Sequence, residues 1–319
     1  MNARYTLLVA ILLLALPLSV WGQTVPEGYP PNGFRPLPQT VLMAKIEEPP
    51  EPLSLPSSLD WRDAGIITTP KNQSSCGCCW AFAAIGCMEA MCRLAGASSS
   101  IDFSEQYPTS CDSAMYLGVT NEGCCGGTVT VFEFLRMHES WTETQFPFNT
   151  GDREGARECS PGSGIGAFNT VPCPGTPSPP LSGWQVSTWT MISSQQIATV
   201  AEMKTALQSG PVWLGYYIYE DFYDYWGSAT TTPYVHTYGA NLGGHAVLLI
   251  GYNDSPGYWI VKNSWGATGG PFGDGTFRVD YNGNCSFGIN AARCTVTGAD
   301  PPSAVDSSTW TRLKQAFRD

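Results

Sequence analysis

Residues 72–82 read NQSSCGCCWAF, and this stretch decides the expected fold and chemistry of the chain. Polar and small residues form a loop that runs into an apolar helix, with Cys79 at the start of the helix. The free N–H groups and the dipole of a helix N-terminus favour a thiolate, which is the reactive form of cysteine. Gln73 carries an amide that can donate a hydrogen bond to a developing oxyanion. The stretch therefore predicts a nucleophilic cysteine.

A cysteine nucleophile needs a base and a group that orients the base. Three histidines are available. His138 ends a predicted helix, where a cation suits the dipole, and His236 lies in a polar loop, so we interpret both as structural. His245 opens an apolar strand after two glycines, and Asn263 follows the next strand by one hairpin. Neighbouring antiparallel strands would place the Asn263 amide against the His245 imidazole, with Trp265 covering that contact from water.

These segments, in this order, resemble the nucleophile, histidine and asparagine regions of papain-like cysteine proteases. The loop resembles the signature C-G-[SA]-C-[WY], with Cys78 in place of serine or alanine. The stretches GGHAVLLIGY, residues 243–252, and YWIVKNSWG, residues 258–266, match the other two regions closely. The resemblance runs from about residue 55 to residue 295. The histidine and asparagine lie farther from the cysteine than is usual, which we attribute to insertions in the Pro/Gly stretch and in the loop over residues 220–243.

The resemblance implies a role for each matching residue. Cys79 would be the nucleophile and His245 its base and later its acid, while Asn263 would orient the imidazole. Gln73 and the backbone N–H of Cys79 would form the oxyanion hole. An ion pair with the imidazolium would lower the pKa of the Cys79 thiol. A nucleophile of this kind would hydrolyse peptide bonds through an acyl-enzyme.

The resemblance also implies substrate contacts and disulfides. In GCCGG, residues 123–127, Gly126 and Gly127 would form the wall where substrate backbone approaches. Trp265 would border the site, and Ala292 would floor the main specificity pocket, whose small apolar character favours hydrophobic or aromatic residues. No His-rich loop of the dipeptidyl carboxypeptidase kind is present, so we expect an endopeptidase.

The chain has 12 cysteines, and in an exported protein these indicate disulfides. The family comparison implies the pairs Cys76–Cys124 and Cys111–Cys159. We further hypothesise that Cys78 pairs with Cys125 and that a local loop joins Cys285 to Cys294. Three others have no assigned partner: Cys87, Cys92 and Cys173. For Cys87 and Cys92, a buried thiol is the simplest interpretation.

The periodicity of the chain predicts helices in its first half and strands in its second. Helices are expected over 79–94, 129–138 and 197–208, and strands over 183–192, 211–219, 245–252, 257–262 and 275–281. A Pro/Gly/Ser stretch over 147–183 would cross between the halves. The expected fold class is α+β, a two-lobed papain-like fold with a helical N-terminal lobe, a sheet or barrel-like C-terminal lobe and the active-site cleft between them.

The N-terminus has the pattern of a secretory signal over residues 1–22, where a basic residue precedes an apolar run too short to span a membrane. Residues 23–56 hold many prolines and form either a short propeptide or a linker. The peptidase domain would cover 57–299 and a polar tail 300–319. We expect a secreted protein, with the periplasm or a lysosome-like compartment as alternatives, and no membrane attachment after signal removal.

Composition narrows the possible partners. A net charge of −11 argues against nucleic acid, which needs a basic surface. We expect a monomer that acts on protein or peptide substrates, can be bound by protein inhibitors, and needs no cofactor or metal. Three other interpretations stay open: an inactive binding homologue, a transpeptidase using the same acyl-enzyme, and a metal site built from Cys76, Cys78 and Cys79.

Overall fold

The structure is a computed structural model that describes residues 33–39, 54–149, 157–158, 167–168, 171–174 and 182–298. The expected signal segment and the C-terminal tail lie outside the described residues, as does most of the proline-rich segment 23–56. None of the helices within the described ranges is long and apolar enough to cross a bilayer.

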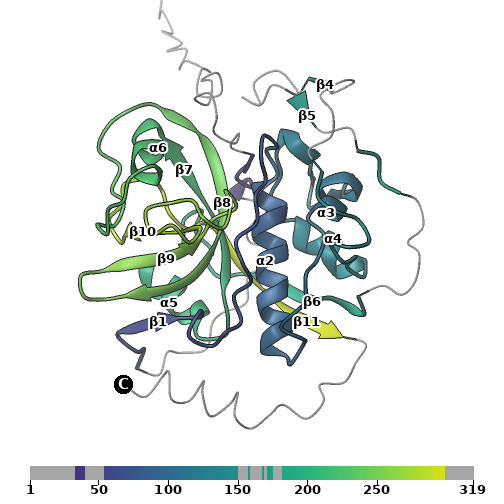
Figure 1. Ribbon diagram of the computed structural model, residues 1–319, viewed down its shortest axis with the longest axis horizontal. Coiled ribbons are helices and arrows are strands. Elements are labelled where there is room, and N and C mark those ends of the chain that lie inside the picture. The colour runs from purple at the N-terminus through teal and green to yellow at the C-terminus, as the bar shows by residue number, and fades with distance from the viewer. Residues whose placement is uncertain are drawn as a thin grey trace, which may run out of the picture.

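The first half of the described chain is mainly helical and lies to one side of the molecule (Figure 1). Its helices are α2 (Cys79–Leu94), α3 (Gln106–Cys111), the 3₁₀ turn η2 (Gly123–Cys125) and α4 (Val131–Met137). Two short antiparallel pairs accompany them, β2 (Met115–Tyr116) with β3 (Val119–Thr120), and β4 (Arg157–Glu158) with β5 (Ala167–Phe168).

The second half is built on an antiparallel sheet in the order β10-β9-β8-β7-β11-β6, with β1 paired to β8 (Figure 1). The strands are β1 (Ser58–Asp60), β6 (Trp184–Met191), β7 (Val212–Tyr219), β8 (Asn241–Asn253), β9 (Tyr258–Lys262), β10 (Thr276–Asp280) and β11 (Ile289–Gly298). Helices α5 (Val200–Leu207) and α6 (Glu220–Trp226) belong to this half. The α+β class expected from the sequence is confirmed.

Helix α2 lies where the two halves meet and contacts β7, β8 and β11 (Figure 1). It is buried on nearly all sides because apolar residues cover most of its circumference. Its bounds are those that the sequence predicted. Glu89 is the acidic exception on this buried helix and is only 1% exposed. The helix thus carries Cys79, at its first position, into the hydrophobic core, where it belongs to one of the two buried clusters.

Two expectations need correction. Strand β8 begins at Asn241, so it includes the two glycines that precede His245. The segment 220–243, interpreted as a loop insertion, contains the helix α6. That helix is short, and its stability comes from tertiary packing of Phe222 and Trp226 against Trp265 rather than from helix propensity.

Candidate active site

The Cys79 sulfur lies beside β8 at Ala246, the residue that follows His245. The backbone N–H of Ala246 donates to Cys79 Sγ at 3.4 Å, and both Cys79 and His245 are completely buried. Helix α2 begins at Cys79, so the sulfur is at the helix end where N–H groups have no intrahelical partner. The sequence separates Cys79 from Ala246 by 167 residues. The packing of α2 against β8 brings them together.

His245 is held by the side chain of Asn263. The distance from His245 Nε2 to Asn263 Oδ1 is 2.8 Å. The backbone N–H of Ser264 also donates to Oδ1, at 2.8 Å, which fixes the orientation of the amide because an N–H can only face the oxygen. Nε2 must therefore carry the hydrogen. In a neutral imidazole this leaves the lone pair on Nδ1, which is buried and has no hydrogen-bond partner in the described part of the chain.

Trp265 closes this pair off from solvent on one side. Its ring centroid lies 5.0 Å from that of His245, and Tyr223 from α6 stacks on the Trp265 ring at 5.6 Å. Trp265 is 7% exposed. The hydrogen bond between His245 and Asn263 thus lies in a dry environment, where it is stronger than in water.

Gln73 is buried in the loop before α2 and is tied to the Asn263 segment. Its Oε1 accepts from Ser264 Oγ at 2.6 Å, and its backbone N–H donates to the Ser264 carbonyl at 2.9 Å. Its Nε2 donates to the Cys76 carbonyl at 2.8 Å. The amide is therefore held rigidly between the loop before α2 and the end of β9.

Burial controls the ionisation of Cys79 and His245. Burial raises the pKa of Cys79 to about 11, although the backbone N–H groups of Ala246, Gly33 and Trp80 favour the thiolate. Burial lowers the pKa of His245 to about 4, and the hydrogen bond to Asn263 opposes this only in part. The described state therefore favours a neutral thiol beside a neutral imidazole. The sequence predicted a lowered thiol pKa, and the difference arises because the site is covered.

Residues 33–39 form that cover. They lie between the N-terminal end of α2 and β8, and appear as the short purple segment in Figure 1. The backbone N–H of Phe34 donates to Gly244 at 2.9 Å, while Arg35 donates to Gly127 at 2.8 Å and Gly127 donates to Gly33 at 2.7 Å. One segment thus forms β-type bridges to both halves of the chain at once.

The Phe34 side chain fills a pocket between the halves. Phe34 is 1% exposed, and its ring packs edge-on against Trp213 with centroids 5.5 Å apart. A Cβ added to Gly215 would overlap this ring, and one added to Gly244 would overlap the Phe34 backbone. The pocket exists because these two positions carry no side chain.

Comparison with known protein families identifies the family of this chain. Residues 55–297 match the sequence model of the papain family cysteine proteases. The chain belongs to this family. Cysteine proteinase B of Leishmania mexicana is 31% identical over 227 residues, which is 69% of this chain and 44% of the relative. Cathepsin B-like CP2 of Giardia intestinalis is 30% identical over 70% of this chain and 69% of the relative. This papain-family chain thus spans less than half the length of the Leishmania relative.

Solved structures of the family show the same fold. Bromelain from Ananas comosus, in complex with the inhibitor E64, has a TM-score of 0.53 and 27% identity, and the match covers 76% of this chain and 99% of bromelain. The proCathepsin B S9 of Trypanosoma congolense has a TM-score of 0.61, with 84% of this chain and 86% of that chain covered. Its identity of 21% supports the fold alone.

Of the substrate-binding residues expected from the sequence, Gly126 and Gly127 contact segment 33–39 in this papain-family chain, whereas Ala292 is buried in the sheet. Gly127 hydrogen-bonds segment 33–39, and a Cβ on Gly126 would come within 2.6 Å of the Gly33 carbonyl oxygen. Ala292 is completely buried on β11, opposite Trp213 in the strand register. Sequence reasoning did not select Trp213, Gly215 or Gly244. A glycine inside an apolar strand was the available signal, since it often marks close approach of another backbone.

The disulfides confirm one expectation and overturn others. Cys76 pairs with Cys124 as expected. Cys111 pairs with Cys173, not with Cys159, because the fold brings their Cα atoms within 4.9 Å of each other. Cys125 is disulfide-bonded while Cys78 is a free buried thiol, so the hypothesised Cys78–Cys125 pair is wrong.

The other cysteines that the structure describes are buried thiols, while Cys159 lies outside the described residues. Cys285 and Cys294 are both free, so the local loop that we expected between them does not form. Cys294 instead lies 3.7 Å from Cys87, sulfur to sulfur. A metal site from Cys76, Cys78 and Cys79 is excluded because Cys76 is oxidised, and the described residues contain no cluster of three potential metal ligands.

The other two histidines lie in different environments. His236 Nδ1 lies 3.1 Å from Asp221 Oδ1, and its ring stacks on Tyr219. Asp221 also accepts from Tyr234, whose hydroxyl lies 2.6 Å away. His138 follows α4 and packs against Phe134. Both arrangements support the structural interpretation.

Proposed function

We propose that this chain is a secreted papain-like cysteine endopeptidase, described here in a latent state. The observation that carries the proposal is the arrangement of three side chains. Cys79 starts a buried helix beside His245, and Asn263 fixes the His245 tautomer that leaves Nδ1 free as a base. This is the relationship that a nucleophile, its base and an orienting group require.

The proposed reaction is acyl transfer to water. His245 Nδ1 takes the proton from the Cys79 thiol, and the thiolate adds to the carbonyl carbon of a peptide bond. The oxyanion faces the helix N-terminus and the Gln73 amide. The C–N bond then breaks as the imidazolium gives its proton to the leaving amine. Water, deprotonated by the same imidazole, hydrolyses the thioester and restores the thiol.

Substrate binding follows from the contacts that segment 33–39 makes. Gly127 and Gly244 offer backbone groups to an extended chain, so a peptide substrate would add as a short strand. The Phe34 pocket would then accept an aromatic or large apolar side chain. Protein and peptide substrates fit these features, as do inhibitors that imitate an extended peptide.

Segment 33–39 blocks the site without being cut. The backbone N–H of Gly33 faces the Cys79 sulfur. Gly127 bonds Gly33 and Arg35 in a parallel bridge, and we infer that this chain direction keeps a scissile carbonyl away from the thiol. We propose that residues 23–56 are an inhibitory propeptide, the first of the two interpretations that the sequence left open.

The test is labelling with an epoxide that alkylates activated thiolates, followed by peptide mass mapping. We expect no labelling of the uncleaved protein and labelling of Cys79 alone after residues 23–56 are removed. His245→Ala should abolish the labelling, while Lys204→Met, a substitution on α5 far from the site, should leave it unchanged. Labelling of the uncleaved protein at the same rate would refute latency, and failure to label after removal would refute the peptidase.

Hydrolysis itself is measured separately on protein and peptide substrates. Removal of residues 23–56 should give cleavage inside a polypeptide, and Cys79→Ala should remove it. Products that carry an added amine nucleophile in place of water would show transpeptidation instead.

A further inference from the structure

Lys262 is a buried cation directly adjacent to Asn263, and none of the chemistry described above uses it. It ends β9, and only 8% of the residue is exposed. Its side chain reaches helix α2, where the position of a Cβ on Gly86 would lie 3.4 Å from Lys262 Nζ. Gly86 is two helical turns from Cys79 on the same helix face. The lysine therefore connects the strand of the catalytic asparagine to the helix of the nucleophile.

A hydrogen-bond chain makes this connection specific. Lys262 Nζ donates to Thr68 Oγ1 at 2.7 Å, and Thr68 Oγ1 donates to Glu89 Oε2 at 2.6 Å. All three side chains are buried. Glu89 lies on α2, so the chain joins the helical half to the end of β9. Buried links of this kind hold two elements in one relative position, because each polar group needs its partner.

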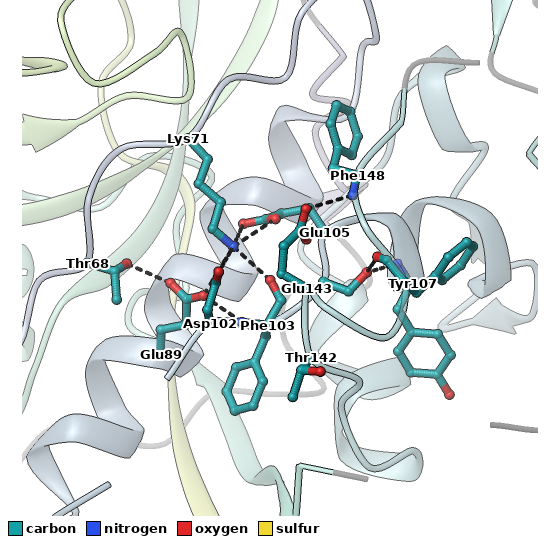
Figure 2. A network of polar contacts seen from close by, with 12 residues as sticks. Thr68, Lys71, Glu89, Asp102, Phe103, Glu105, Tyr107, Thr142, Glu143 and Phe148 are labelled. Atoms are coloured by element: carbon teal, nitrogen blue, oxygen red, sulfur yellow. Dashed lines mark hydrogen bonds and ion pairs between the residues drawn. The ribbon is translucent and has the colours of Figure 1, made fainter. Parts of the chain in front are cut away.

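A second lysine, Lys71, forms ion pairs with nearby carboxylates, as Figure 2 shows. Lys71 Nζ lies 3.3 Å from Glu89, 2.6 Å from Asp102 and 2.9 Å from Glu105, and it donates to the Phe103 carbonyl. Burial lowers the pKa of Lys71, but the carboxylates of Glu89 and Glu105 outweigh it and raise this pKa overall. Lys71 thus balances the acidic groups of the network.

The ammonium of Lys262 is stabilised less than that of Lys71, because no carboxylate is paired directly with it among the described residues. Its hydrogen bond goes to a neutral hydroxyl, and burial lowers its pKa to about 8. The carboxylates of Glu89 and Glu105 oppose this effect, while Lys71 and Arg93 add to it. Glu105 titrates in the same range, since burial raises its pKa to about 8 against the opposing charge of Lys71. The ammonium of Lys262 is therefore a buried charge that mildly alkaline pH removes.

A small cavity joins Lys262 to the catalytic amide. It has a volume of about 10 Å³ and is lined by Lys71, Glu105, Lys262 and Asn263 among others. That volume fits about one water molecule. Asn263 Nδ2 is buried and has no hydrogen-bond partner among the described residues. A water molecule in this cavity would accept a hydrogen bond from Asn263 Nδ2 and would link the amide to the charged network.

We propose that Lys262 is a positioning residue for the peptidase, which holds Asn263 against His245 through its contacts with Thr68 and α2. This inference rests on the proposed function but concerns a different residue. Lys262 does not contact substrate. Its effect passes through Asn263, so it changes turnover more than substrate binding.

The direct test is the ¹H NMR signal of the His245 Nε2–H, recorded on the uncleaved protein. His245 is neutral there above pH of about 4, so its own titration does not interfere. We expect a protected downfield signal that weakens as the pH rises past about 8, where Lys262 loses its proton. Lys262→Arg keeps its charge and should retain the signal. Since Glu105 is unchanged in that variant, retention assigns the effect to Lys262.

The kinetic test uses the protein after removal of residues 23–56. Lys262→Met should lower kcat about tenfold, which corresponds to about 1.4 kcal/mol of transition-state stabilisation, with little change in KM. Lys262→Arg should recover part of this loss. Thr68→Val removes only the linking hydroxyl and should act in the same direction, while Thr68→Ser should behave as the unchanged protein. Lys204→Met is the matched control, because it breaks an ion pair with Asp254 that does not involve Lys262, Thr68 or Glu89.

Either of two results would overturn the proposal. One is a Lys262→Met protein with unchanged kcat and an unchanged His245 signal. The other is a loss of kcat in Lys262→Met that parallels a loss of thermal stability. In that case Lys262→Arg would not recover the activity, and the His245 signal would stay unchanged. Epoxide labelling of Cys79 in the unsubstituted protein tests the peptidase itself, so failure of that function is separable from failure of this inference.

Discussion

The backbone N–H of Phe34 donates to the carbonyl of Gly244 at 2.9 Å, one residue before His245. This hydrogen bond joins a residue near the N-terminus of the described chain to the strand that carries the candidate base. It places the Phe34 side chain in the pocket made by Trp213 and Gly215, and it covers the thiol and imidazole. The features that would bind a substrate are thereby occupied by the chain itself.

Phe34→Ala should activate the uncleaved protein. The ring is almost fully buried, and replacing a buried phenylalanine by alanine costs about 3–5 kcal/mol in a packed site. Part of that loss would fall on the covered state, so peptide hydrolysis before processing should rise at least about tenfold. Gln39→Ala, which alters an exposed contact to Ser194, is the control and should change little. Equal activity of the Phe34→Ala and unsubstituted proteins would contradict the inhibitory role.

Gly33→Val tests the same segment by adding volume. A Cβ on Gly33 would overlap the carbonyl oxygen of Gly77 in the loop before Cys79. The substitution should therefore expel the segment, and the uncleaved protein should label with the epoxide. After residues 23–56 are removed, the variant and the unsubstituted protein become the same enzyme and must have identical kinetics.

Gly215→Val should change substrate preference in the processed enzyme. The new side chain would occupy the space of the Phe34 ring. The ratio of kcat/KM for peptides with phenylalanine at the pocket position to those with alanine there should fall by about 10-fold or more, the effect of losing about 1.5–3 kcal/mol of apolar burial. An unchanged ratio would show that substrates do not use the pocket that Phe34 fills.

Thiol reactivity should depend on pH differently before and after removal of residues 23–56. Burial raises the pKa of Cys79 to about 11 in the covered state, so its alkylation by a small haloacetamide should need strongly alkaline solution. Uncovering the site admits solvent, which lowers the desolvation penalty on both the thiolate and the imidazolium. The midpoint of the alkylation profile should move to lower pH, and His245→Ala should reverse part of that shift.

Asp221 should stabilise the fold at neutral pH and lose this effect in acid. Burial raises its pKa, but hydrogen bonds from Thr237, Tyr234 and His236 outweigh that and lower it overall. A carboxyl with a lowered folded-state pKa stabilises the protein above its unfolded pKa, and the effect disappears as pH falls through the folded value. Asp221→Asn should lower the free energy of unfolding by about 1–3 kcal/mol at pH 7, and the difference should shrink towards pH 3.

The prediction for His236 separates stability from catalysis. If its pairing with Asp221 is structural, His236→Ala should lower thermal stability and leave kcat unchanged. Denaturant unfolding and peptide hydrolysis measured on the same sample decide this. A loss of kcat without a loss of stability would give His236 a part in catalysis that the structure does not suggest.

Local sequence patterns predicted the elements with strong periodicity. The helix over residues 79–94 was predicted with its bounds because apolar residues cover most of its circumference and a loop of small residues precedes it. The α+β class came from this periodicity, while the candidate triad of Cys79, His245 and Asn263 came from three short motifs in a fixed order. Such motifs are readable because nucleophilic chemistry restricts which residue types can stand at each position.

Only the tertiary structure decided the contacts between residues far apart in the chain. Cysteine spacing does not determine connectivity, so the Cys111–Cys173 pair became visible only where the fold brought the two residues together. Segment 33–39 has no pattern of its own, and its position depends on glycines more than 90 residues away. The Lys262–Thr68–Glu89 chain joins three segments whose side chains meet because α2 packs against β8 and β9 lies beside β8. The sequence by itself determined the chemistry of single positions, while packing determined which positions meet.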